Sequence, residues 1–297
     1  MNLIKKFFLL FAGLFILVSI QAQESKEVAA NLKNYVKGDT TQGWKHSGLT
    51  SLSFGQTSLQ NWVAGGNNTV SGDFVFNASL NYLKDKFFWD NNLVVEYGTV
   101  YSSTTDWMKA ADKLNLTSIA GRKISKAWSL SALLNFYTQF TNGYDYATDK
   151  NKRISTFMAP GYLDLALGFT YKPNAKYSVF LSPLSERATF VLDDSLSNSG
   201  AFGVSPGKKT NFQTGAYVLA STTQTISSNL SLISSLDLFT PYSKDFGNID
   251  VNWDLLVSYK LSKLLTATLN TTLRYYDKEL HKVQFKEILG LGFTYKF

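Results

Sequence analysis

Apolar and polar residues alternate along most of the chain, and the pattern is clearest at its carboxyl end. The segment 283–297, VQFKEILGLGFTYKF, has an apolar or aromatic residue at nearly every second position. A period of two predicts a β-strand with one apolar face. Glu287 interrupts this face. If the apolar face lies against a membrane, a tilted strand needs only about 9–11 residues to cross it, so Glu287, eleventh from the end, would lie at the membrane rim. A charge at such a rim costs ~0–1 kcal/mol.

The same alternation recurs about twelve times after Trp44. The clearest predicted strands cover residues 70–82, 87–101, 128–140, 163–171, 251–261 and 265–275, and weaker ones cover 49–58, 114–124, 177–192, 212–226 and 230–239. Pro183 lies within one weaker segment and predicts a bulge or an edge-like break there, because proline cannot donate to the strand ladder. The pattern therefore predicts an all-β fold.

The breaks between these segments alternate in length. Short breaks lie at 84–86, 125–127, 173–176, 227–229 and 262–263, and long ones lie at 59–68, 102–112, 142–156, 193–211, 240–250 and 277–282. Outer-membrane barrels have short periplasmic turns and longer extracellular loops. The alternation predicts a transmembrane antiparallel β-barrel of about twelve strands over residues 44–297, with both ends in the periplasm.

Composition agrees with this prediction. Mean hydropathy is only −0.09 although 15% of the residues are aromatic, as expected when each strand is half apolar. Many aromatic residues lie at predicted strand ends and would form two belts at the membrane surfaces; the alternative is that aromatics are simply common in strands. The inner belt comprises Trp89, Trp128, Tyr171, Tyr177, Tyr259 and Tyr295, and the outer belt Tyr101, Phe140, Phe190, Phe212, Phe239, Trp253, Tyr275 and Phe285.

The amino end predicts export. A short basic start, a run of fourteen mostly apolar residues and an Ala22 cleavage site indicate a secretory signal peptide at 1–22. Residues 23–43 are polar and are expected to form a short periplasmic segment. Loss of Lys5 and Lys6 leaves 27 basic and 22 acidic residues, an excess too small and too scattered to indicate nucleic-acid binding. The absence of Cys excludes disulfides and thiol chemistry.

Several motifs, in order along the chain, carry a resemblance. They are WKHSGLTSLSFGQTSLQNWVAGGNN from Trp44, then FWDNNLVVEYG, QFTNGYDY, FMAPGYLDLALGFTYKPN, SGAFGV and KEILGLGFTYKF. Together they resemble an uncharacterised family of Gram-negative, Bacteroidota-type outer-membrane proteins, catalogued as a domain of unknown function, over about residues 44–297. The aromatic end also resembles the carboxy-terminal signature of outer-membrane barrels. That resemblance implies a membrane-insertion signal at Tyr295 and Phe297 for the outer-membrane assembly machinery.

The side of each strand opposite the apolar face is expected to line a lumen. Its charged residues are Asp73, Glu96, Asp164, Arg187, Asp237, Asp254, Arg274 and Lys286, all in the predicted outer half. Buried charges must pair, so one interpretation is a salt-bridged plug. The other is a constriction ring that selects solutes, with weak cation preference. The 193–211 loop is long enough to fold inward and alter either outcome.

Other candidate chemistry is weak. His281 lies at the outer end of the last strand, where some outer-membrane lipid hydrolases have a Ser-His pair, but no serine follows two positions later. Ser243 is the other conceivable partner, and His46 is expected to be exposed. The loop acids Asp145, Asp149, Asp193, Asp194, Asp245 and Asp250 have no calcium-loop spacing. No enzyme activity, metal or cofactor is expected.

Three functions follow, in order of preference. The first is a narrow porin-like channel for small solutes in the outer membrane. The second is a closed structural or partner-binding barrel that acts through its extracellular loops. The third, more distant, is an outer-leaflet lipid hydrolase. In each case membrane lipids are the expected partners.

Overall fold

The structure is a computed structural model that describes residues 42–60, 67–146, 148–174, 176–243, 246–262 and 265–297. The predicted signal peptide at 1–22 lies outside the described residues, as does nearly all of the predicted segment at 23–43. Among the described residues, no helix is long and apolar enough to cross a membrane.

Twelve strands form a closed antiparallel barrel, which confirms the predicted fold class. In chain order they are β1 (Gly43–Thr57), β2 (Thr69–Lys84), β3 (Phe87–Ser102), β4 (Asp106–Lys123), β5 (Trp128–Thr138), β8 (Gly161–Asn174), β9 (Tyr177–Phe190), β10 (Thr210–Thr225), β11 (Leu230–Pro241), β12 (Asp250–Lys260), β13 (Leu265–Tyr275) and β14 (Gln284–Lys296). Each strand pairs with the next, and β1 pairs with β14 to close the ring. At this seam the Gly48 N–H donates to the Phe297 carbonyl at 2.8 Å.

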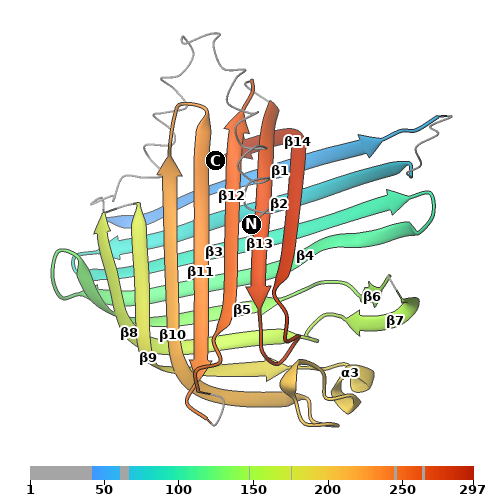
Figure 1. The fold of residues 1–297 in the computed structure, drawn as a ribbon. Helices are drawn as coiled ribbons and strands as arrows, with labels where there is room; N and C mark the ends of the chain where they lie inside the picture. Colours follow the sequence, from blue (N-terminus) through green and yellow to red (C-terminus); the bar gives the residue numbers. More distant parts are fainter. Residues whose placement is uncertain (1–41, 61–66, 147, 175, 244–245, 263–264) are drawn as a thin grey trace, which may run out of the picture.

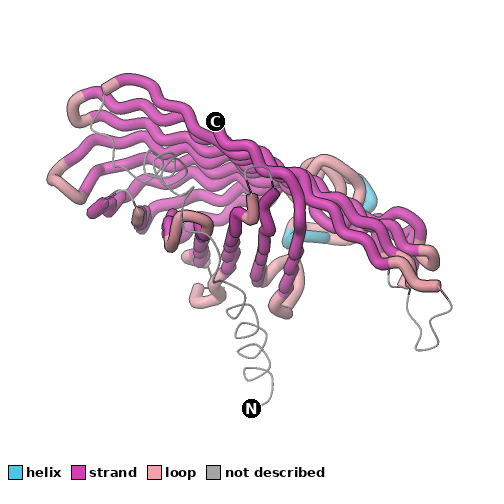
Figure 2. The backbone as a smooth tube through the Cα atoms, turned by 90° about the horizontal axis from the view of Figure 1, so that it is seen from above, coloured by secondary structure: helices cyan, strands magenta, loops and turns pink. Residues whose placement is uncertain are grey.

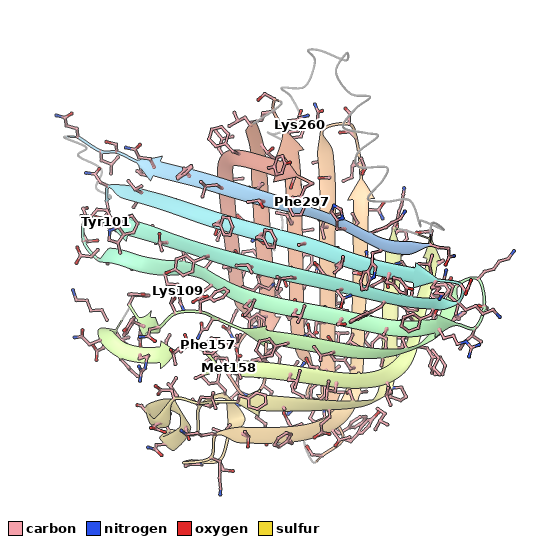
Figure 3. The ribbon with its side chains drawn as sticks, turned by 180° about the vertical axis from the view of Figure 1, so that it is seen from behind. Tyr101, Lys109, Phe157, Met158, Lys260 and Phe297 are labelled. Carbon is pink, nitrogen blue, oxygen red and sulfur yellow. The ribbon has the colours of Figure 1, made fainter. Side chains whose placement is uncertain are left out.

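Four short elements lie in the long connections. β6 (Gly143–Asp145) and β7 (Asp149–Ser155) form a separate hairpin between β5 and β8. The connection from β9 to β10 contains α3 (Asp194–Asn198) and a 3-10 turn, Ala201–Gly203. We call the end of the barrel that carries these connections the long-loop end, and the opposite end the short-turn end. Figure 3 labels Tyr101 and Lys109 near the former and Lys260 near the latter.

The barrel is flattened into two walls. β1 to β5 form one wall and β11 to β14 the other, and the strands of the two walls cross steeply (Figures 1 and 2). β8 to β10 bend from one wall into the other. Strongly tilted strands give this crossing wherever opposite sides of a barrel approach each other.

The predicted loop at 102–112 is wrong. β3 and β4 continue as a paired ribbon to Ser102↔Asp106 and are joined by only three residues. A bulge explains the error, since the register shifts between Gly98↔Ala111 and Thr99↔Lys109. An extra residue in one strand reverses the alternation that the sequence pattern relies on.

The predicted bulge at Pro183 is confirmed. The register of β9 shifts between Ser182 and Ser185 against β10 and between Leu181 and Leu184 against β8. Ser182 Oγ replaces the missing ladder bond in part, since it accepts from Leu184 N–H at 3.2 Å and donates to the Leu167 carbonyl at 2.7 Å. The bulge sets which side chains of the following segment enter the lumen.

The exterior of the barrel is apolar. Alternate side chains along the strands are exposed and large, including Leu52, Phe54, Leu116, Leu130, Leu165, Leu167, Phe169, Leu289, Leu291 and Phe293. The intervening residues point inward and are mostly small or polar, such as Ser51, Ser53, Ser129, Ser131 and Thr170, all buried. An apolar outside and a polar inside reverse the arrangement of a water-soluble protein.

Candidate functional site: the filled lumen

A buried arginine organises the lumen near the long-loop end. Arg187 on β9 has a side chain 2% exposed, and its Nε and Nη2 donate to the two carboxylate oxygens of Asp164 on β8 at 2.6 and 3.3 Å. Its Nη1 donates to Asp250 at 3.0 Å, and Asp237 lies 3.6 Å away. The ring of Phe239 lies 4.3 Å from the guanidinium carbon. Such a fork of donors suits bidentate carboxylate binding.

A second arginine, Arg274 on β13, lies between two aromatic rings. The guanidinium carbon is 4.5 Å from the Tyr137 ring centre and 4.4 Å from that of Tyr276. Its Nη1 is 3.7 Å from Glu279, which also accepts a hydrogen bond of 2.6 Å from the Tyr162 hydroxyl. Glu279 belongs to the connection between β13 and β14, so this loop reaches β8 on the other side of the mouth.

One ion pair crosses the whole lumen. Lys113 on β4 donates to Asp254 on β12 at 2.7 Å, and these strands are six places apart in either direction round the ring. Twelve strands spaced ~4.8 Å and tilted by ~40° would give a round barrel ~24 Å wide. A fully extended Lys–Asp contact bridges only ~12 Å between α-carbons. The walls therefore approach to about half the round width, consistent with the two crossing layers of Figure 1.

Asp254, the acceptor of this ion pair, is held in place by further hydrogen bonds. Asp254 also accepts from Thr272 Oγ1 at 2.8 Å and from Asn252 Nδ2 at 3.1 Å. A second crossing group joins Glu96 on β3 to Lys286 on β14 and to Asn270 on β13, both at 2.9 Å. These contacts hold the two walls together in the half of the lumen nearer the long-loop end.

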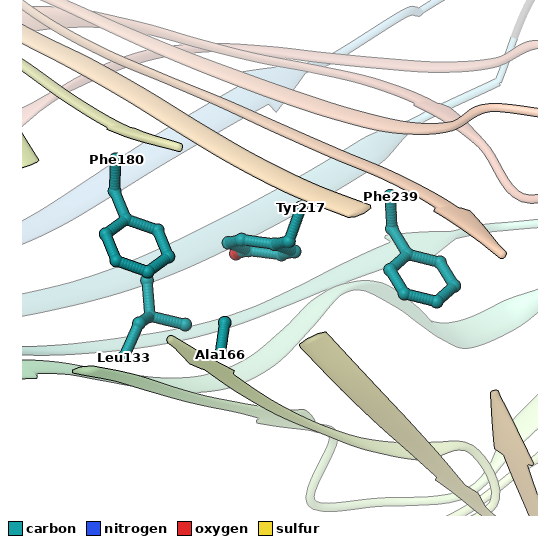
Figure 4. Packing of buried hydrophobic residues seen from close by; sticks show 5 residues of the cluster. All are labelled: Leu133, Ala166, Phe180, Tyr217 and Phe239. Carbon is teal, nitrogen blue, oxygen red and sulfur yellow. The ribbon is translucent and has the colours of Figure 1, made fainter. Parts of the chain in front are cut away.

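An apolar cluster fills the interior beside the charges. Leu133, Ala166, Phe180, Tyr217 and Phe239 come from five adjacent strands and point toward one another (Figure 4). The Tyr217 hydroxyl donates to Asp237, which connects this cluster to the arginine network. Small barrels are commonly filled by side chains in this way.

One belt prediction is wrong. Phe239, predicted at the outer surface, is 1% exposed and lies inside against Arg187. Residues two apart on a strand share a face, so Phe239 follows Asp237 inward. Outward aromatics do line the short-turn end, where Trp44 lies 5.7 Å from Trp89.

All eight charged residues predicted for the lumen lie on barrel strands. Asp164, Arg187 and Asp237 form one network, Glu96 and Lys286 a second, and Asp254 and Arg274 have the contacts described above. Asp73 on β2 lies within electrostatic range of Glu96 and Lys286, and its Oδ1 has no hydrogen-bond partner among the described residues. The remaining predicted residues, Tyr295 and Phe297, are exposed on and just after β14.

Sequence reasoning missed several members of the networks, among them two charged residues of the barrel strands. Lys113 precedes the predicted start of its strand, although it has inward parity relative to Leu114. Asp250 was assigned to a loop as a calcium candidate, yet it pairs with Arg187. Tyr217 and Glu279 carry no sequence signal, because only the folded arrangement brings them to their partners.

The residues considered for other chemistry have local contacts. His281 is 80% exposed, and its Nδ1 lies 3.2 Å from Asp277. Asp193 accepts from Leu196 N–H at the start of α3 and pairs with Arg153 of β7. Across the described part of the chain, no group of three or more metal-ligating side chains is positioned to hold an ion. Asp245 lies outside the described residues.

Family comparison matches residues 54–144 to a family described as "Protein of unknown function (DUF3078)". The match agrees with the resemblance to an uncharacterised family, over a shorter stretch than the expected 44–297. No curated protein matches the chain.

The chain is also similar to several solved barrels. The translocator domain of autotransporter NalP from Neisseria meningitidis has 10% identity and a TM-score of 0.37, over 91% of this chain and 97% of that one. The NanC porin has 8% identity and a TM-score of 0.37, over 82% and 98%. A Salmonella typhi OmpF complex with Daunomycin has 10% identity and a TM-score of 0.27, over 89% and 99%. These likenesses concern general architecture.

Proposed function

We propose that this protein is an integral outer-membrane β-barrel whose lumen is closed by cross-wall ion pairs, and that it acts through its long-loop end. The membrane assignment is supported by the exterior, where large apolar side chains such as Leu167 and Leu289 are 59% and 77% exposed. Exposed apolar area on this scale is unfavourable in water. A closed barrel leaves no unpaired strand edge in lipid.

The orientation rests on connection lengths. Five of the six connections at the long-loop end are longer than any at the short-turn end, which is the pattern of extracellular loops and periplasmic turns. The predicted signal peptide supports export across the inner membrane. We further propose a Gram-negative, Bacteroidota-type source. Membrane lipids and the outer-membrane assembly machinery are the partners that the proposal implies.

The observation that carries the closed state is the Lys113–Asp254 pair. Neither side chain is more than a quarter exposed, and their 2.7 Å contact joins opposite walls. A diffusing solute would have to break this contact and leave two charges unpaired in a confined space, which is unfavourable. Arg187 and Arg274 occupy the lumen closer to the mouth.

Conductance in a planar bilayer tests this proposal. We expect no stepwise current from the wild-type protein, and an increased current from a Lys113→Ala/Asp254→Ala variant, because that variant loses the ion pair between the walls without leaving a charge unpaired. The matched control is Lys209→Ala/Asp194→Ala, which removes a loop pair of similar length, 2.9 Å. Steady wild-type current would refute the closed state. A silent double variant would show that other groups close the lumen.

A narrow channel is the second candidate, and it has its own support. Asp73 Oδ1 and the Nε and Nη2 of Arg274 are buried without hydrogen-bond partners among the described residues. Buried polar atoms need partners, and a thread of lumen water would supply them. If wild-type current appears, Asp237→Asn with Asp254→Asn should reduce cation preference; unchanged selectivity would remove these acids from the conduction path.

We propose no enzymatic function. His281 is largely in solvent, and the carboxylate beside it does not supply a nucleophile. Lipid hydrolysis by purified protein that is lost in a His281→Ala variant would overturn this part of the proposal.

A further inference from the structure

Positive charge gathers on one arc of the short-turn end. Exposed basic residues end β2, β4 and β8 or lie in the turns that follow these strands, and we call them the basic arc: Lys84, Lys86, Arg122, Lys123, Lys126, Lys172 and Lys176. The acids beside them are Asp85 and Asp90, and Asp90 pairs with Lys172 at 3.2 Å. The arc therefore retains a large positive excess.

The rest of the barrel rim differs. In the described residues of the long-loop connections the charges nearly balance, with seven basic against six acidic residues: Lys150, Lys152, Arg153, Lys208, Lys209, Lys278 and Lys282 against Asp145, Asp149, Asp193, Asp194, Asp277 and Glu279. The turn between β10 and β11, residues 226–229, contains no charge. The excess is thus concentrated at the short-turn end, where the arc holds seven basic residues and Lys45 on β1 and Lys260 on β12 lie outside it.

The arc is continuous in space. Lys123 N–H donates to the Lys86 carbonyl at 2.8 Å, and Lys172 N–H donates to the Ala127 carbonyl at 2.8 Å. These bonds bring the β2–β3 turn, the β4–β5 turn and the end of β8 side by side. Seven cations on adjacent turns form one surface for an extended anionic partner.

Outward-facing aromatic rings lie at the same height. Phe87 is 44% exposed on the outer surface, and its register partners are Lys84 on one side and Arg122 on the other. Next along the wall, Trp128 and Tyr171 lie 4.8 Å apart. Aromatic side chains of this kind settle at the headgroup level of a bilayer, and lysine and arginine extend from there toward the phosphates.

We propose that the basic arc binds the headgroups of anionic phospholipids in the leaflet that faces the short turns. The positive charges alone would suit an acidic soluble protein as well as lipid. The aromatic rings at the same height are expected only for a surface at the membrane, so they favour lipid as the partner. The inference rests on the proposed membrane location. A lysine at such a surface contributes about a fivefold preference for an anionic lipid.

Quenching of tryptophan fluorescence by brominated lipids tests the proposal. Trp44, Trp89 and Trp128 lie on the wall that carries the arc, so the test protein has the substitutions Trp62→Phe, Trp107→Phe and Trp253→Phe. It is reconstituted in phosphatidylcholine vesicles that contain one-fifth phosphatidylglycerol, with bromine on one lipid or the other. We expect the ratio of phosphatidylglycerol to phosphatidylcholine beside these tryptophans to be about fivefold higher than in the bilayer as a whole. We expect 1 M salt to reduce this preference.

Two matched variants separate the arc from general charge. Lys84→Gln, Lys86→Gln, Lys126→Gln and Lys176→Gln together should abolish the preference, whereas Lys150→Gln, Lys152→Gln, Lys208→Gln and Lys282→Gln should leave it unchanged. Quenching by each lipid in proportion to its share of the bilayer, with the arc unchanged, would overturn the proposal, as would a preference that survives the first variant. Salt-sensitive binding of polyglutamate without a lipid preference would indicate an acidic protein partner instead. If neither lipid quenches, the membrane location itself is wrong.

Discussion

Removal of Arg187 tests whether buried charge pairing holds the lumen together. The substitution Arg187→Met keeps much of the side-chain volume but leaves Asp164, 1% exposed, with one weak partner among the described residues, the Asn135 amide at 3.4 Å. Asp237 loses its guanidinium neighbour as well. Breaking a buried pair in this way costs ~3–5 kcal/mol, which lowers the ratio of folded to unfolded protein by roughly two to nearly four orders of magnitude.

The assay is urea unfolding of the barrel folded into lipid vesicles, followed by tryptophan fluorescence. The comparison variant is Lys172→Met, which breaks the exposed pair with Asp90 and should cost less than ~1 kcal/mol. The double variant Arg187→Met/Asp164→Asn removes the unpaired charge along with the arginine, so it should recover part of the loss. The reasoning fails if Arg187→Met costs no more than Lys172→Met, because the lumen would then be wet enough to solvate a bare carboxylate.

Two further pairs of variants test the exterior and the barrel closure. Leu289→Arg places a charge on the lipid-facing side of β14 near mid-depth and should cost ~2–4 kcal/mol, whereas Glu287→Arg nearer the rim should cost ~0–1 kcal/mol; equal values in the same urea assay would argue against lipid contact. Gly292→Ala would place a Cβ 1.9 Å from the Leu52 carbonyl oxygen across the β1–β14 seam and should destabilise by ~1–3 kcal/mol. At Gly72 the nearest atom to such a Cβ is 4.0 Å away, so Gly72→Ala should be tolerated; similar effects at both sites would show that the seam is not tightly packed.

The local alternation of the sequence was sufficient to identify the architecture. A period of two fixes which side chains share a face, and the spacing of breaks fixes how many strands there are, since both depend only on neighbouring residues. Pro183 even located its bulge, because its missing N–H is a property of the residue itself. The bulge opposite Gly98, where Ala110 is the extra residue of β4, has no proline to mark it, and the predicted loop at 102–112 was wrong for that reason.

The contents of the lumen were decided by the tertiary structure. Periodicity placed Asp254 and Asp237 inward, but it could not show that Lys113, 141 residues away, would reach Asp254. That contact exists because the barrel is flattened, and flattening depends on the packing of two whole walls against each other. In the same way, the basic arc was scattered lysines and one arginine along the chain until three connections were brought side by side. Alternation along a strand is a local property, whereas distance across a barrel belongs to the closed sheet as a whole.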